Sequence, residues 1–119
     1  MSFEGSCHCG KVTFSVAADL PKTGMDCNCS HCHAKGFLLA FFPKDAFTLK
    51  SGADALKAYT FNTHKIEHQF CTTCGTQPFA YGNNPADGAP LACVNLRCVT
   101  GLDLGKLTLQ PFEIGRAHV

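Results

Sequence analysis

Cys71-Thr72-Thr73-Cys74-Gly75, past the middle of the chain, and Cys7-His8-Cys9, near its start, are the stretches that decide the fold. Cysteine pairs separated by one or two residues have the ligand spacing of tetrahedral zinc sites. When the chain folds back on itself, the two pairs can bind one ion with four thiolates. We therefore expect a closed, structural zinc site whose ligands are Cys7, Cys9, Cys71 and Cys74. The alternative is two unrelated pairs of buried thiols.

A third cysteine cluster lies between these pairs, in the stretch Cys27-Asn28-Cys29-Ser30-His31-Cys32. Residues i and i+2 of an extended segment point the same way, and a turn can bring in a third thiol. We expect Cys27, Cys29 and Cys32 to hold a second Zn²⁺ with an open fourth position, which is typical of catalytic zinc. An open site is also the one expected to lose its ion more readily. The alternative is a fourth protein ligand, which makes both sites structural; the candidates are His31, His33, His64 and His68.

The charge of the three-thiol cluster indicates its chemistry. Three thiolates on Zn²⁺ leave a net charge of −1, which makes the ion a weaker Lewis acid than zinc held by three neutral imidazoles. Such a centre favours a soft incoming ligand, namely another thiol. A zinc-held thiolate that attacks or releases a carbon electrophile is therefore expected in preference to hydrolysis.

Length and cysteine usage indicate one reduced, zinc-binding domain spanning residues 1–119. Nine cysteines are an odd number, and they cluster at metal-ligand spacings. Met1-Ser2-Phe3-Glu4-Gly5 has neither the basic start nor the apolar core of a signal peptide. We therefore expect zinc-held thiolates in the cytoplasm rather than disulfides. No apolar run approaches the roughly 18 residues of a membrane span, so no membrane association is expected.

The net charge gives no reason to expect nucleic acid as a partner. The formal charge of +1 counts every cysteine as neutral, and seven thiolates with two Zn²⁺ ions would bring it to −2. Nucleic-acid-binding domains normally carry a basic patch. A nucleic-acid-binding zinc ribbon is therefore disfavoured, also because basic residues are not interleaved with aromatic ones.

Short apolar and alternating segments predict an all-β fold with a few single helical turns. Val12, Phe14 and Val16 alternate with polar residues, which is the pattern of a half-buried strand. Residues 37–42 are expected to be a strand buried on both faces, and Pro78 indicates an edge strand. The expected strands are residues 11–16, 25–29, 37–42, 47–50, 58–61, 64–70, 77–81, 91–96 and 107–112, with helical turns near 43–46 and 52–56.

Several further residues have both an ordinary and a functional interpretation. Besides being candidate zinc ligands, His31 and His33 fit solvated loop positions or a role in proton transfer. The strand histidines, His64 and His68, fit hydrogen-bonded core positions better than zinc ligands. Cys93 fits core packing, and Cys98 fits either packing or a redox thiol. Arg97 and Lys35 could hold a carboxylate of the substrate, or they could face water.

Four stretches together resemble the glutathione-dependent formaldehyde-activating enzyme family, which also includes centromere protein V. They are Gly5-Ser6-Cys7-His8-Cys9-Gly10-Lys11-Val12-Thr13-Phe14, Cys27-Asn28-Cys29-Ser30-His31-Cys32, His68-Gln69-Phe70-Cys71-Thr72-Thr73-Cys74-Gly75-Thr76 (with Thr63-His64-Lys65 before it) and Val94-Asn95-Leu96-Arg97-Cys98. The resemblance implies twisted antiparallel sheets and two zinc ions, and it divides the seven thiols into the same four and three. It also implies a carbon–sulfur lyase activity that condenses formaldehyde with glutathione to S-hydroxymethylglutathione.

The leading hypothesis is therefore a zinc-dependent carbon–sulfur lyase that acts on a small thiol or its aldehyde adduct, with Cys27, Cys29 and Cys32 at the catalytic centre. The alternative is a non-catalytic, zinc-stabilised binding or chaperone-like module, which a fourth protein ligand at the Cys27 cluster would favour. A redox protein that uses Cys93 or Cys98 is a third possibility.

Overall fold

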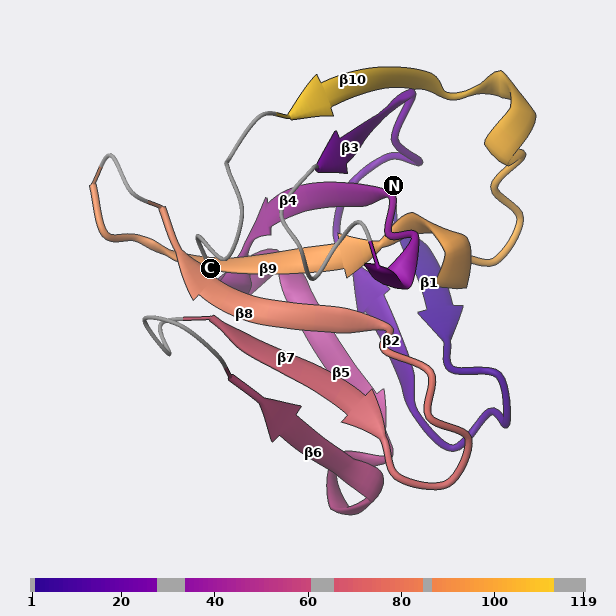
Figure 1. Cartoon of the computed structure of the whole chain (residues 1–119), viewed down its shortest axis with the longest axis vertical. Coiled ribbons are helices and arrows are strands. Elements are labelled where there is room, and N and C mark those ends of the chain that lie inside the picture. The colour runs from indigo at the N-terminus through magenta and orange to yellow at the C-terminus, as the bar shows by residue number, and fades with distance from the viewer. Residues whose placement is uncertain (1, 28–33, 61–65, 85–86, 113–119) are drawn as a thin grey trace.

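The structure is a computed structural model that describes residues 2–27, 34–60, 66–84 and 87–112. Strands and single turns of 3₁₀ helix make up its regular structure apart from a short helical piece at residues 34–35 (Figure 1). The strands are β1 (Phe3–Ser6), β2 (Thr13–Val16), β3 (Thr23–Cys27), β4 (Leu39–Pro43), β5 (Phe47–Ser51), β6 (Leu56–Tyr59), β7 (Glu67–Cys71), β8 (Phe79–Asn83), β9 (Pro90–Asn95) and β10 (Thr108–Phe112). The 3₁₀ turns are η1 (Lys44–Ala46), η2 (Ala53–Ala55), η3 (Leu96–Cys98) and η4 (Leu104–Lys106).

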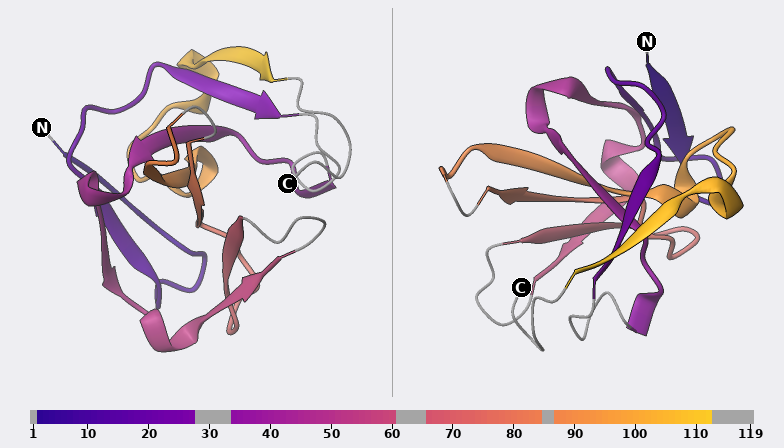
Figure 2. Two further views of the ribbon diagram at one scale, coloured as in Figure 1. Left: turned by 90° about the vertical axis from the view of Figure 1, so that its left-hand side faces the viewer. Right: turned by 90° about the horizontal axis from the view of Figure 1, so that it is seen from above.

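The strands form two sheets that pack as layers. One sheet has the order β1-β2-β5, and the other has the order β10-β3-β4-β9-β8-β7-β6. In the view of Figure 1 the three-stranded sheet lies behind the seven-stranded one, and Figure 2 shows the separation from the side. Neighbouring strands are antiparallel apart from β3 and β10, which run parallel. The expected β-dominated class is confirmed.

The hydrophobic core lies between the two sheets. Alternation along β2 buries Phe14 and Val16 completely, while Thr13 and Ser15 stay partly exposed. The Phe14 ring stacks on Phe47 of β5 at 5.4 Å between centroids, and Phe47 contacts Phe79 of the larger sheet at 4.7 Å. Each buried phenylalanine contributes about 1.5–3 kcal/mol through removal of apolar surface from water. This aromatic cluster fixes how the two sheets face each other.

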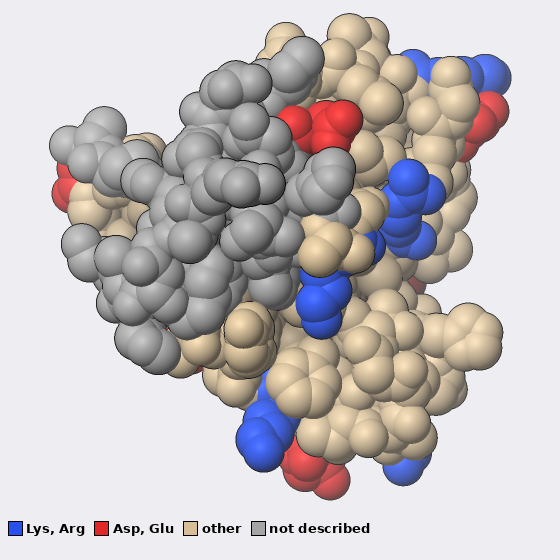
Figure 3. Space-filling view, viewed as in Figure 1, with Lys and Arg blue, Asp and Glu red and all other residues tan. Residues whose placement is uncertain are grey.

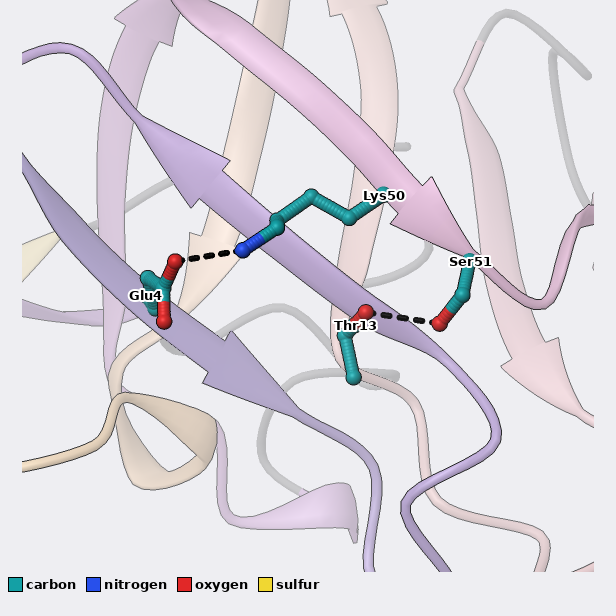
Figure 4. Close-up of polar contacts among 4 residues, drawn as sticks. All are labelled: Glu4, Thr13, Lys50 and Ser51. Atoms are coloured by element: carbon teal, nitrogen blue, oxygen red, sulfur yellow. Dashed lines mark hydrogen bonds and ion pairs between the residues drawn. The ribbon is translucent and has the colours of Figure 1, made fainter.

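The other face of the three-stranded sheet carries polar cross-strand contacts (Figure 4). Lys50 of β5 reaches across β2 to Glu4 of β1, with 2.6 Å between Nζ and Oε2. The hydroxyl groups of Thr13 and Ser51 lie 2.6 Å apart. Because the Lys50 and Glu4 side chains are half exposed, their ion pair is worth at most about 1 kcal/mol. The apolar core, rather than this surface, therefore contributes most to the stability of the layer.

Most of the expected strands are found, with boundaries shifted by a few residues. The segment predicted for residues 37–42 is β4, but it begins at Leu39, and Phe41 is 39% exposed. The prediction that this strand is buried on both faces is therefore wrong, since the apolar run continues onto a face that is only partly covered. Phe37 and Leu38, which are buried, precede the strand.

Two further differences concern strand position. Pro78 does not mark an edge, because β8 starts at Phe79 and lies between β7 and β9 inside the larger sheet. Pro78 precedes the strand, and its carbonyl accepts a hydrogen bond from the Asn95 N–H at 2.9 Å. Strand β1 was not expected.

Within the described residues, no helix combines the length and the apolar composition needed to cross a membrane.

Candidate metal centre

Cys7 and Cys9 lie in the turn that joins β1 to β2. The N–H of Cys7 donates to the Val12 carbonyl at 3.0 Å, and the N–H of Gly10 donates to the Cys7 carbonyl at 3.2 Å. Gly10 has φ = 82°, a left-handed conformation that a glycine adopts without steric cost. The Val12 N–H also points at the Cys7 sulfur at 3.4 Å. The turn therefore directs both thiols of the C-x-C pair to one side.

Cys71 and Cys74 lie in a second turn, directly after β7, with a similar construction. The N–H of Gly75 donates to the Cys71 carbonyl at 2.8 Å, and the N–H of Cys71 donates to the Thr76 carbonyl at 2.9 Å. Gly75 has φ = 79°, so in both turns a left-handed glycine directly follows the last cysteine. Thr72 fixes the turn to η2 through the Ala55 carbonyl, which accepts from its N–H and from its hydroxyl, both at 2.7 Å.

The two turns bring four sulfur atoms together, all within 4.8 Å of one another. Sγ of Cys9 lies 3.5 Å from Sγ of Cys7 and 3.7 Å from Sγ of Cys71, which is 62 residues away in sequence. Zinc–sulfur bonds of about 2.3 Å in a tetrahedron place the sulfur atoms about 3.8 Å apart. A disulfide needs about 2.05 Å, and all four residues are free cysteines. The donor set therefore fits a metal ion such as zinc.

Burial and hydrogen bonding make the four thiols unequal. Cys7 and Cys71 are buried, whereas Cys74 is partly exposed and Cys9 is exposed. The Thr76 hydroxyl, 3.4 Å from the Cys74 sulfur, and then the Thr76 backbone N–H lower the pKa of Cys74 to about 5. The pKa of Cys71 is lowered by backbone hydrogen bonds, first from Cys74.

Cys9 shows the opposite shift. The Lys11 backbone N–H lowers its pKa, but desolvation and hydrogen bonds with the three neighbouring thiols together raise the pKa to about 11. Four thiolates this close repel one another, so full ionisation of the cluster requires a cation among them. A divalent ion bound by the four thiolates would offset this repulsion.

The structure describes only the first residue of the three-thiol cluster, Cys27. Cys27 is the last residue of β3, and its register partner on β10 is Phe112. Cys29, Cys32, His31, His33 and His64 lie outside the described residues. His68 is described: it lies in β7 and is 5% exposed. The cluster Cys27, Cys29 and Cys32 thus stays a prediction, as does its fourth ligand.

The two remaining cysteines lie in or beside the core. Cys93 is a buried residue of β9, and burial raises its pKa to about 12. Cys98 ends η3, where burial, with smaller contributions from Cys7 and Cys74, raises its pKa to about 11. Raised pKa values keep both groups as neutral thiols near pH 7, which makes them poor nucleophiles.

Asn95 is a structural residue that sequence reasoning missed. It is 7% exposed, its Nδ2 donates to the Gln77 carbonyl at 3.1 Å, and its Oδ1 accepts from the Arg97 N–H at 3.2 Å. Arg97 in turn donates from Nε to the Gly36 carbonyl at 3.0 Å. The signal was present in the sequence, because an asparagine at the end of an apolar run is a typical helix-capping residue.

Comparison with known proteins places this architecture in a family. Residues 2–109 match the family model described as glutathione-dependent formaldehyde-activating enzyme. A crystal structure of a Rhodobacter sphaeroides protein is similar, with 27% sequence identity, a TM-score of 0.73, and coverage of 90% of this chain and 99% of that chain. The family match spans nearly all described strands and includes all seven cysteines of the two clusters. The chain belongs to the glutathione-dependent formaldehyde-activating enzyme family.

Proposed function

We propose that this protein is a zinc-dependent carbon–sulfur lyase that acts on a small thiol or its aldehyde adduct, with glutathione and formaldehyde as the first pair to test. The observation that supports the proposal most directly is the four-thiol cluster of Cys7, Cys9, Cys71 and Cys74, in a chain whose family is named for this chemistry. The chain supplies three further clustered thiols that this cluster does not use. We place the reaction at those three.

The four-thiol cluster would hold a structural zinc ion. Its four side-chain ligands fill a tetrahedron and leave no position for a substrate. Two of the four sulfur-bearing residues, Cys7 and Cys71, pack into the core between the sheets. Metal binding there would therefore join the start of β2 to the end of β7 and contribute to folding free energy.

Cys27, Cys29 and Cys32 would hold the second zinc ion as three thiolates. When bound there, zinc would accept the sulfur of a substrate thiol as its fourth ligand. This coordination would lower the pKa of the substrate thiol. In the proposed reaction a carbon–sulfur bond forms between the substrate sulfur and the aldehyde carbon. The thiol proton ends on the former carbonyl oxygen, so the product is the S-hydroxymethyl thiol, and the reverse reaction releases aldehyde and thiol.

A reducing compartment such as the cytoplasm suits this assignment. The six cysteines whose side chains are described are free thiols. Thiolates that hold zinc and receive a substrate thiol must stay reduced, and cytoplasmic conditions maintain that state.

NMR exchange measurements on zinc-loaded protein, glutathione and formaldehyde test the proposal. We expect the exchange rate between free glutathione and S-hydroxymethylglutathione to rise with protein concentration. Cys29→Ser should reduce the rate to that of buffer, while Cys93→Ser, which removes a thiol outside both clusters, should keep it. A rate equal to that of buffer with wild-type protein would leave the zinc-stabilised binding module as the better interpretation.

A further inference from the structure

The four-thiol cluster is buried on one side and reaches solvent on the other. Cys7 and Cys71 are buried and belong to the hydrophobic core. Cys74 is partly exposed, whereas Cys9 and the residues directly before and after it are exposed. Figure 1 shows the two cysteine turns side by side at the lower right, at the periphery of the molecule. A reagent in solution can therefore reach the cluster most easily at Cys9.

Cys9 would combine this exposure with a negative charge. A cysteine that ligates a metal ion is a thiolate, and the thiolate is the form of cysteine that attacks electrophiles. The susceptibility of a thiolate to modification rises with its exposure. The sulfur of Cys7, by contrast, is buried and faces the Val12 N–H at 3.4 Å. Among the four thiols, Cys9 is therefore expected to be the most reactive.

Lys11 brings a positive charge to the same side of the cluster. Its backbone N–H is hydrogen-bonded to the Cys9 sulfur. Its Nζ donates to Oγ1 of Thr73 at 3.3 Å and so links the first cysteine turn to the second. Lys11 and Thr73 are both exposed. The ammonium group therefore lies on the solvent side of the two turns that form the cluster.

The charge of Lys11 is available to attract an anion. Within the described parts of the chain, the carboxylate that forms an ion pair is that of Glu4, and its partner is Lys50 rather than Lys11. On the face that Figure 3 shows, the basic side chains of the described residues occur at several separate places rather than in one extended patch. Exposed charges act over about a Debye length, roughly 8 Å at physiological ionic strength. Attraction of an anion to Cys9 therefore depends on Lys11 itself.

We propose that Cys9 is a modification site at which small anionic electrophiles attack the four-thiol cluster, and that Lys11 attracts them to it. The Cys9 thiolate forms a bond to the electrophilic atom with its own electron pair, and the leaving group departs with the electrons of the bond that breaks. A modified Cys9 is no longer a thiolate ligand, so the ion would be held by three thiolates and lost more readily. The inference goes beyond the proposed function and does not depend on the chemistry at the three-thiol cluster.

Iodoacetate and iodoacetamide provide the test, because they have similar size and shape and only iodoacetate is charged. With either reagent the Cys9 sulfur bonds to the CH₂ carbon and iodide leaves. Zinc-reconstituted protein is treated with each reagent, and tandem mass spectrometry of its peptides gives the rate of modification at each cysteine. We expect Cys9 to be alkylated first among the four thiols of the cluster.

The ratio of the two rates at Cys9, iodoacetate over iodoacetamide, isolates the effect of charge. Lys11→Gln should lower this ratio about threefold, the size of an interaction between exposed charges, and Lys11→Arg should keep it. Salt at 1 M should bring the wild-type ratio down to that of Lys11→Gln, because it screens the attraction. Lys106→Gln is the matched control and should keep the ratio. It removes an exposed lysine from η4, next to β10 at the far edge of the larger sheet.

Release of the ion is followed separately, with a chromogenic zinc chelator. Cys29→Ser protein serves here, since its one expected ion lies in the four-thiol cluster, and it should release zinc at the rate at which Cys9 is alkylated. Zinc release that precedes Cys9 modification, or alkylation of Cys7, Cys71 or Cys74 before Cys9, would overturn the assignment of Cys9. A ratio unchanged in Lys11→Gln, or lowered equally in Lys106→Gln, would overturn the role of Lys11. Either result leaves the proposed function untouched.

Discussion

The two thiol clusters differ in how the chain assembles them. The four-thiol cluster draws one pair from the turn before β2 and the other from the turn after β7, and Cys9 and Cys71 are 62 residues apart. The three-thiol cluster lies within six consecutive residues that start at the last position of β3. An ion held by distant segments stabilises the whole fold, whereas an ion held by neighbours in sequence constrains only a short segment. The proposed assignment therefore gives an ion in the four-thiol cluster a folding function and an ion in the three-thiol cluster a chemical one.

Loss of a ligand from the four-thiol cluster should have the largest effect. Cys71→Ser removes a thiolate whose side chain is completely buried, at the point where β7 ends. Structural zinc contributes free energy on the order of 10 kcal/mol in small peptides, comparable to the stability of a whole domain. We expect this variant to be unfolded at 25 °C, which circular dichroism and limited proteolysis would detect. A Cys71→Ser protein with the wild-type melting temperature would show that the cluster does not hold the fold together.

Loss of a ligand from the three-thiol cluster should abolish activity without unfolding the protein. Cys29→Ser is expected to lower the rate of S-hydroxymethylglutathione exchange at least a hundredfold, because one zinc ligand is missing. The free energy of unfolding should change by less than about 1 kcal/mol, since the affected ion constrains only a local segment. Urea denaturation monitored by circular dichroism gives the second quantity. Unfolding of Cys29→Ser would mean that the two clusters are not separate in function.

A cysteine outside both clusters should have the smallest effect, and one that depends on pH. Burial raises the pKa of Cys93 to about 12 in the folded protein, from an ordinary value of 9.0. The unfolded chain therefore loses this proton first as the pH rises, so the group stabilises the fold below pH 9 and that stability disappears between pH 9 and 12. In wild-type protein this difference makes the free energy of unfolding fall by up to about 1.4 kcal/mol per pH unit between pH 9 and 12. Cys93→Ala should remove this contribution, so its free energy of unfolding should fall less steeply at alkaline pH.

Activity near pH 7 should stay unchanged in Cys93→Ala, and also in Cys98→Ala, because both thiols are protonated there. Loss of activity in either variant would favour the redox interpretation of the sequence. The same denaturation series, repeated at several pH values, supplies both the stability data and the folded samples for the activity measurement.

Local features of this fold could be read from the sequence because their causes are local. Alternation at Val12, Phe14 and Val16 and the C-x-C and C-x-x-C spacings each depend on a few neighbouring residues. The four-thiol grouping followed from the ligand spacing of the two pairs, which together supply the four ligands of a tetrahedral zinc site.

Other features could not be read because they depend on partners far away in sequence. Strand β1 escaped detection because Gly5 interrupts its alternation, and the reason for Gly5 is tertiary: a Cβ there would lie 2.6 Å from the Cys98 carbonyl oxygen. The parallel pairing of β3 with β10 joins segments about 85 residues apart, which no local pattern encodes. Likewise, the exposure of Phe41 depends on what covers β4.

The number of zinc ions per chain tests the division into four and three thiols most directly. Elemental analysis of zinc-reconstituted, desalted protein should give two ions per wild-type chain and one per Cys29→Ser chain, with both proteins folded. A single ion per chain in both proteins would contradict the account, because the thiols at Cys27, Cys29 and Cys32 would then hold no ion of their own.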